Sequence, residues 1–176
     1  MKRIILTTVV CLLASACAGP RPDEAAALVE LKHFPIDSLE EVRAVQGVSF
    51  DRSVSKDGQG SLRVDAEESL LVPLFEVTDV GLKNATLLYQ ASLQSERLNG
   101  EAWLEMFVRF PGRGEFFSRG MDQPVTGTMS WKTVTIPFFL QEGQEPDLIR
   151  LNLMVKGKGR VWIDDVRLLK RPLPGR

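Results

Sequence analysis

The chain has 176 residues, of which 44% are hydrophobic and 26% charged, and its formal net charge is −1. This length and composition are typical of one globular domain with a single sizeable core. The absence of a basic surplus argues against a nucleic-acid-binding protein.

The N-terminus has the pattern of a secretory signal peptide over residues 1–16. Lys2 and Arg3 form a positive start, residues 4–13 are apolar, and small residues follow at 14–16. The apolar run is too short for a membrane-spanning helix. The next residue is Cys17, and the segment resembles the lipobox of bacterial lipoproteins, in which this cysteine is lipidated and becomes the mature N-terminus. Plain secretion after ordinary cleavage at the A-x-A triplet is the alternative.

The lipobox resemblance implies a protein anchored to a membrane of the bacterial cell envelope. Ala18 after Cys17 is similar to the pattern of lipoproteins sorted to the outer membrane, and residues 17–32 would then form the lipidated cysteine and a short tether. Cys11 leaves with the signal peptide, so the mature chain cannot form an intramolecular disulfide.

From His33 onward the patterns indicate β-strands. Weak strands are expected at residues 34–36 and 45–50, and residues 61–65 alternate cleanly between apolar and polar. The apolar run at 70–77 contains Pro73, which predicts an edge strand or a bulged strand, because proline cannot donate a ladder hydrogen bond.

The middle of the chain has the most regular alternation. Residues 85–95 and 102–110 each predict a strand with one core face, separated by a turn at Asn99-Gly100. The expected core positions are Leu87, Tyr89, Ala91 and Leu93 in the first run, and Ala102, Leu104, Met106, Val108 and Phe110 in the second.

Three further strands follow, at 131–138, 148–156 and 157–168, the last two joined by a turn at Gly157-Lys158-Gly159. The total is about nine short strands with no helix after residue 32. The sequence therefore predicts an all-β fold, an antiparallel β-sandwich of the jelly-roll type over residues 33–172.

Two adjacent aspartates, Asp164 and Asp165, interrupt the apolar pattern of the last strand. An unpaired carboxylate is costly to bury. Either both side chains lie in water at a sheet edge, or one of them faces inward onto a cation or a hydrogen-bond donor.

Three stretches resemble the carbohydrate-binding-module-like jelly rolls of the galactose-binding-like fold. They are residues 57–64 (DGQGSLRV), 131–137 (WKTVTIP) and 161–168 (VWIDDVRL). The resemblance implies a concave sheet able to cradle a glycan. It also implies a structural Ca²⁺, held by the Asp164 carboxylate, by a backbone carbonyl of the loop around Gly58, and by Asp37 near the first strand.

Strand alternation gathers aromatic and polar side chains on the face opposite the core positions. Sugar recognition needs a flat aromatic surface and groups that hydrogen-bond hydroxyls. The candidate glycan-binding residues are Gln90, Trp103, Glu105, Phe107, Arg109, Arg150 and Asn152. The alternative is that Trp103 and Phe107 pack beneath the loop that contains Phe116 and Phe117.

The loop at residues 110–120 supports a second hypothesis. Its arginines, glycines and paired phenylalanines are compatible with an exposed tip that docks a protein or touches lipid, or with a hairpin that folds its phenylalanines inward.

Catalysis has little support in the sequence. His33 is the only histidine, and no H-E-x-x-H or G-x-S-x-G motif occurs. A glycosidase built from Glu105 and another carboxylate is not favoured. We therefore expect a non-catalytic, lipid-anchored envelope protein that binds a glycan. The alternative is an envelope protein–protein interaction module on the same scaffold.

Overall fold

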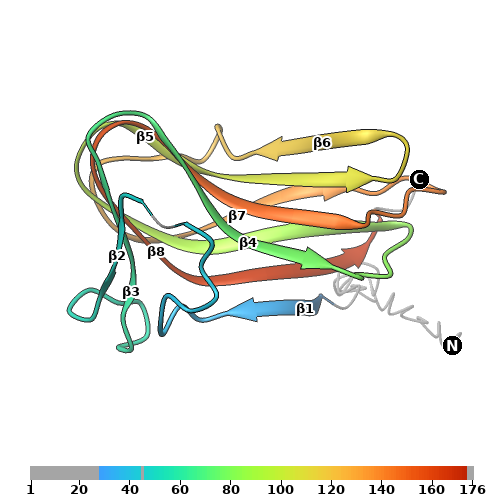
Figure 1. Ribbon diagram of the computed structural model, residues 1–176, viewed down its shortest axis with the longest axis horizontal. Coiled ribbons are helices and arrows are strands. Elements are labelled where there is room, and N and C mark those ends of the chain that lie inside the picture. Colours follow the sequence, from blue (N-terminus) through green and yellow to red (C-terminus); the bar gives the residue numbers. More distant parts are fainter. Residues whose placement is uncertain (1–27, 45, 174–176) are drawn as a thin grey trace, which may run out of the picture.

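The computed structural model describes residues 28–44 and 46–173, and this part of the chain forms an antiparallel β-sandwich without an α-helix (Figure 1). Its eight strands are β1 (Val29–Phe34), β2 (Val48–Asp51), β3 (Ser61–Ala66), β4 (Leu70–Thr78), β5 (Ala85–Phe110), β6 (Gly114–Arg119), β7 (Val125–Phe139) and β8 (Leu148–Pro172). The predicted fold class is confirmed.

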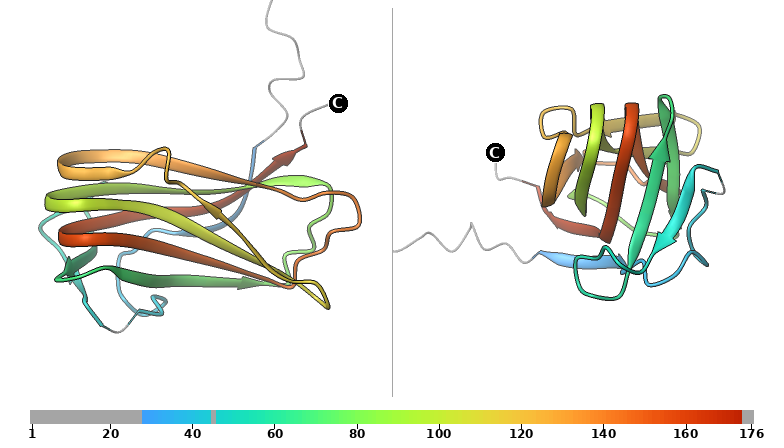
Figure 2. Two further views of the ribbon diagram at one scale, coloured as in Figure 1. Left: turned by 90° about the horizontal axis from the view of Figure 1, so that it is seen from above. Right: turned by 90° about the vertical axis from the view of Figure 1, so that its left-hand side faces the viewer.

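The long strands β5 and β8, of 26 and 25 residues, run side by side and bend together from one layer of the sandwich into the other. Figure 1 shows both strands curving round one end of the molecule, and the right view of Figure 2 looks onto that end. Layer I contains β1, β2, β3, the first part of β5 and the last parts of β7 and β8. Layer II contains β4, β6, the last part of β5 and the first parts of β7 and β8.

Glycines allow this corner to form. Gly100 and Gly157 face each other in the register and have φ angles of +140° and +122°. A Cβ atom on Gly100 would lie 2.0 Å from the carbonyl oxygen of Lys156, and one on Gly157 would lie 2.2 Å from that of Asn99. Only glycine lets the two backbones approach so closely at these angles.

The expected turns at Asn99-Gly100 and Gly157-Lys158-Gly159 are therefore not turns between separate strands. Each lies inside one continuous strand, at the corner. The expected count of about nine short strands becomes eight in the described chain. Strands β5 and β8 each join two of the expected strands, and β6 lies in the segment expected as a loop at residues 110–120.

The core between the layers is apolar and matches the predicted alternation. Every expected core position in β5 is at most 3% exposed, and Ile149, Leu151, Leu153 and Val155 of β8 are fully buried. The prediction for Pro73 is also confirmed. Strand β4 pairs with β8 alone among the described strands, and its register shifts between Pro73 and Phe75.

Strand β1 begins at Val29 and pairs with the end of β8, so residues 29–32 belong to the sheet and not to the tether. The signal peptide, Cys17 and the rest of the expected tether lie outside the described residues. Within the described part of the chain, no helix is long and apolar enough to cross a membrane.

Candidate functional site

Six of the seven predicted ligand residues share the outer face of layer II. Trp103, Glu105, Phe107 and Arg109 alternate along β5 with buried core residues, and β8 presents Arg150 and Asn152 beside them. The register pairs Phe107 with Arg150 and Glu105 with Asn152. We call this surface the layer II face.

The seventh residue, Gln90, does not belong to this group, and its assignment to the same face was wrong. It lies in the first part of β5, between Arg167 of β8 and Thr135 of β7, on the outer face of layer I. Its side-chain amide donates a hydrogen bond to Thr135 Oγ1 at 3.0 Å. The bend in β5 carries the later residues of this strand to the other side of the sandwich.

A hollow of about 360 Å³ opens on the layer II face. It is lined by Arg43, Leu71, Pro73, Glu76, Phe107, Glu115, Arg150 and Asn152. Three of these residues come from the predicted set. The others come from β4, β6 and the loop before β2, so they could not be grouped before the strand register was known.

Ion pairs hold the charged side chains around this hollow. Arg43 Nη1 donates to Glu76 Oε2 at 2.7 Å, and Arg150 Nε donates to Glu76 Oε1 at 3.1 Å. Arg150 Nη1 also donates to Glu115. The two arginines and two glutamates balance in charge, and each fixes the position of the next.

Arg109 lies at the margin of the layer II face and forms a bidentate pair with Asp147, with N···O distances of 2.9 and 3.0 Å. This hydrogen bonding raises the pKa of Arg109 and lowers the pKa of Asp147. The arginine is therefore already engaged within the protein.

Trp103 and Glu105 are buried, with exposed fractions of 6% and 4%. Glu105 accepts a hydrogen bond from Arg119, and Trp103 Nε1 has no partner among the described residues. Because so little of its ring reaches the surface, Trp103 fits the packing alternative and offers no stacking platform.

Phe107 is half-buried and lies beside the more exposed Phe117, with ring centroids 6.2 Å apart. The Arg119 guanidinium lies 4.1 Å from the centroid of the Phe117 ring. Phe116 and Phe117 are 45% and 55% exposed, so the hairpin does not fold both phenylalanines inward. Phe107, Phe117 and Leu71 supply the apolar surface near the hollow, whereas Phe116 packs against Phe110 on the other side of β6.

Asp164 is fully buried in the central strand β8, where the loop that contains Lys56 covers its side chain. Its Oδ2 accepts the backbone N–H of Lys56 at 2.8 Å, and its Oδ1 accepts that of Asp165 at 2.7 Å. Burial raises the pKa of Asp164, while these two hydrogen bonds act in the opposite direction. Asp165 instead pairs with Arg167 and His33. The edge alternative was wrong for Asp164, which lies on the outer side of layer I with its register partner Ser92 and is covered by backbone donors.

Of the three residues implied for calcium, only Asp164 and the loop that contains Gly58 lie close together. The loop that contains Gly58 touches Asp164 through Lys56, whereas Asp37 is exposed and lines a small hollow with Phe34 and Phe75. Among residues 28–44 and 46–173, no three Asp, Glu, His or Cys side chains gather into a metal-binding group. A cation at Asp164 would therefore depend mainly on backbone carbonyls.

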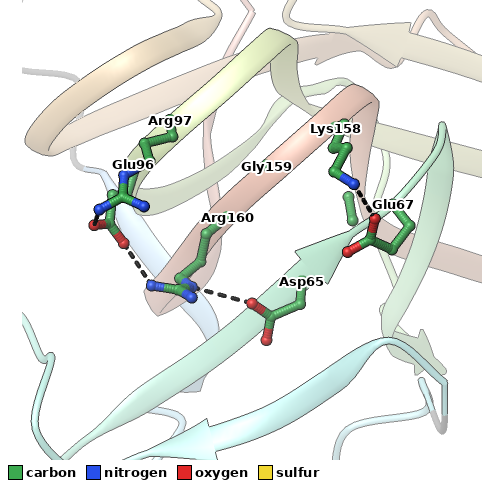
Figure 3. Close-up of a pocket in the computed structure, with 8 residues that line it drawn as sticks. Asp65, Glu67, Glu96, Arg97, Lys158, Gly159 and Arg160 are labelled. Carbon is green, nitrogen blue, oxygen red and sulfur yellow. Dashed lines mark hydrogen bonds and ion pairs between the residues drawn. The ribbon is translucent and has the colours of Figure 1, made fainter.

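A second hollow lies at the corner and is lined mainly by charged side chains (Figure 3). Arg160 donates to Glu96 at 2.5 Å and to Asp65 at 3.0 Å, and Lys158 pairs with Glu67. These contacts link β3, β5 and β8 where the sheet bends. Because these charges satisfy one another, the hollow is better suited to holding the corner than to binding a ligand.

No protein-family model and no curated protein matches the sequence. Several solved structures do match. The CBM22-1 xylan-binding domain of Paenibacillus barcinonensis Xyn10C has 16% identity and a TM-score of 0.59, over 85% of this chain and 99% of that domain. TmCBM61, solved in complex with β-1,4-galactotriose, has 18% identity and a TM-score of 0.52, over 75% of this chain and 90% of that one.

The chain has a carbohydrate-binding-module-like fold. The jelly-roll resemblance found in the sequence is thereby confirmed. A cyclase from Fischerella sp. TAU is also similar, with 16% identity and a TM-score of 0.53, over 82% of this chain and 85% of the cyclase. The fold alone therefore does not decide the function.

Proposed function

We propose that this chain is a non-catalytic glycan-binding protein, held in the bacterial envelope by a lipid on Cys17. The observation that carries the proposal is the hollow on the layer II face, with Phe107, Arg150 and Asn152 in its lining. The similarity to modules described as binding xylan and β-1,4-galactotriose supports it.

The hollow combines the two kinds of group that a sugar needs. Phe107, Leu71 and Pro73 offer apolar surface to the C–H face of a sugar ring. Glu76 and Arg150 offer acceptors and donors for hydroxyl groups, and Asn152, which is 4% exposed, lies at the base of the hollow. Because ion pairs already hold Glu76 and Arg150 in place, these two side chains lose little freedom on binding.

The charge balance of the hollow favours an uncharged glycan. Its two arginines and two glutamates neutralise each other in the chain Arg43–Glu76–Arg150–Glu115. Both carboxylates accept hydrogen bonds from arginine, which suits positioning of hydroxyl groups better than proton donation. We therefore assign no catalytic step to them.

The test is calorimetric titration of the mature protein with neutral and anionic envelope polysaccharides. We expect one neutral glycan to bind, and Phe107→Ala and Arg150→Ala each to weaken binding about tenfold or more while the fold is retained. Gln90→Ala is the matched control, since Gln90 lies on the opposite side of the sandwich. Equal losses in Phe107→Ala and Gln90→Ala would contradict the site.

A second candidate function is docking of an envelope protein through the β5–β6 hairpin. The exposed rings of Phe116 and Phe117 favour it. In that case no glycan would bind, and Phe116→Ser would abolish cross-linking to one defined partner. Phe116 does not line the hollow, so this variant separates the two functions.

The lipid anchor is tested by the mass of the mature protein isolated from a bacterial envelope. We expect acylation at Cys17, and release of a Cys17→Ser variant from the outer-membrane fraction. Unmodified protein that is recovered as a soluble species would favour plain secretion.

We also propose a structural Ca²⁺ beside Asp164, bound by this carboxylate and by carbonyls of the loop that contains Gly58. Calcium accepts mixed carboxylate and carbonyl ligands, and its charge would offset the burial of Asp164. With Ca²⁺ at a hundredfold excess over Kd, we expect about 2.7 kcal/mol of added stability, seen as a higher Tm than in EDTA. The same Tm in Ca²⁺ and EDTA, or the same shift in Asp164→Ala, would remove the calcium site.

A further inference from the structure

A third hollow, of about 470 Å³, combines apolar walls with cationic side chains. Val29, Leu82 and Pro172 belong to the walls, and Lys83, Lys170 and Arg171 supply the cations. No acidic residue of the described chain lines it. The Lys83 ammonium lies 2.6 Å from the Glu145 carboxylate, whereas Lys170 and Arg171 form no ion pair with any described residue.

This hollow lies where the chain enters the fold. Val29 is the first residue of β1, pairs with Lys170 and lines the hollow, so β1 begins at its wall. Figure 1 shows the start of β1 and the end of β8 at the same end of the sandwich, opposite the corner. Leu28 and Val29 are 56% and 43% exposed at this entry point.

We propose that this hollow faces the membrane and binds the phosphate groups of anionic phospholipids. The inference rests on the proposed lipid anchor at Cys17. The chain from Cys17 to Val29 can span at most roughly 40 Å. The entry end is therefore held close to the bilayer that contains the anchor.

The side chains suit a phospholipid surface. Ammonium and guanidinium groups donate charge-assisted hydrogen bonds to phosphate oxygens. Each basic residue near an anionic membrane strengthens binding about fivefold. Leu28 and Val29 are placed to contact the apolar boundary below the headgroups.

Docking by this end would set the orientation of the domain. The layer II face lies along the side of the sandwich and carries none of these cationic residues. A domain seated on its entry end would therefore leave the proposed glycan-binding hollow open to ligands beside the membrane.

The test is co-sedimentation of the mature chain from Ala18 onward, without the lipid, with phosphatidylcholine vesicles and with vesicles that also contain phosphatidylglycerol. This chain contains all eight strands. We expect binding to the anionic vesicles alone, weakened by salt because exposed charges are screened. Lys170→Glu combined with Arg171→Glu should reduce binding at least about tenfold.

The matched control is Arg97→Glu combined with Lys158→Glu. These residues line the corner hollow at the opposite end, and their double substitution changes the net charge equally. The control should keep vesicle binding within about twofold of the wild type. Equal losses in the two double variants, binding to neutral vesicles, or no binding to anionic vesicles would overturn the proposal.

The result of the vesicle experiment can be distinguished from the results of the glycan-binding and lipidation tests. Phe107→Ala should leave vesicle binding unchanged, because Phe107 does not line this hollow. Vesicle binding by the unlipidated chain also does not depend on whether Cys17 is acylated. Inorganic phosphate serves as the competitor, and full displacement by millimolar phosphate would indicate a free anion as the ligand and overturn the membrane assignment.

Discussion

The outer faces of the two layers share strands β5, β7 and β8 but organise their polar groups differently. Where β5 and β7 pair in layer I, short side chains complete their hydrogen bonds with the neighbouring strand. The Gln90 amide donates a hydrogen bond to the Thr135 hydroxyl, and the hydroxyl oxygens of Ser92 and Thr133 lie 3.3 Å apart. On layer II, longer charged side chains pair above the sheet and surround a hollow.

This difference makes the β5–β7 part of layer I a weaker candidate for binding than the layer II hollow. Elsewhere, layer I also carries ion pairs at Arg63 and Arg167 and a hollow of about 470 Å³ beside Trp162. A hydroxyl or amide that is satisfied inside the sheet has little left to offer a ligand. An ion pair held above the sheet leaves unused lone pairs and N–H groups at its edges. The comparison depends on the corner, because the bend places two stretches of β5 on opposite sides of the molecule.

The largest effect is therefore expected from a change at the corner itself. Gly157→Ala would place a Cβ 2.2 Å from the carbonyl oxygen of Asn99 at a φ of +122°. The backbones of β5 and β8 would have to separate, which we expect to cost more than about 4 kcal/mol of unfolding free energy. Denaturant titration measures this cost.

Gly127→Ala is the matched control. Gly127 also has a positive φ, +61°, but a Cβ there would meet no atom within 4 Å. We expect a cost of about 1 kcal/mol from the backbone angle alone. Similar costs for the two substitutions would mean that the corner does not depend on close approach of the strands.

A smaller loss of unfolding free energy is expected from substitutions of two aromatic residues on the layer II face, and the loss should differ between them. Trp103→Ala removes a buried side chain and should lower the unfolding free energy by about 3 kcal/mol. Phe107→Ala removes a half-buried ring at the hollow and should cost about 1 kcal/mol. Thermal melting and glycan titration of both variants provide the measurement. Loss of glycan affinity in Trp103→Ala at unchanged stability would reverse these roles.

The core could be predicted from sequence because a strand has a side-chain period of two. The corner could not. Asn99-Gly100 and Gly157-Lys158-Gly159 have the residues of hairpin turns, and the same glycines also permit two strands to bend together. Which of these occurs depends on Gly100 lying opposite Gly157, a pairing that neither segment shows on its own.

The sequence predicted which residues of one strand share the site's face, but not which residues of different strands meet there. Phe107, Arg150 and Asn152 were found because alternation places them opposite the core. Glu76 and Glu115 were missed, since their link to Arg150 depends on strands far apart in sequence. The contact of Asp164 with the Gly-rich loop was anticipated from the family resemblance, not from periodicity.

The smallest effect concerns pH and sharpens the contrast between the faces. On the layer I side, Asp51 accepts hydrogen bonds from the Ser53 hydroxyl at 2.6 Å and from Trp162 Nε1 at 3.0 Å. These bonds lower the pKa of Asp51 from 3.8 to about 2. A carboxyl with a lowered folded-state pKa adds stability above its unfolded pKa and loses that stability as the pH falls through the folded value.

The loss should therefore fall between about pH 4 and pH 2 and amount to about 1 kcal/mol, because solvent reaches part of the carboxylate. Asp51→Asn removes the titrating group, so its unfolding free energy should depend less on pH over this interval than that of the wild type. Trp162→Phe removes one of the two side-chain donors and should raise the pKa of Asp51, as followed by NMR titration. Parallel stability curves for the wild type and Asp51→Asn would show that the hydrogen bonds on the layer I side do not stabilise the charged form. The proposed contrast with layer II would then rest on geometry alone.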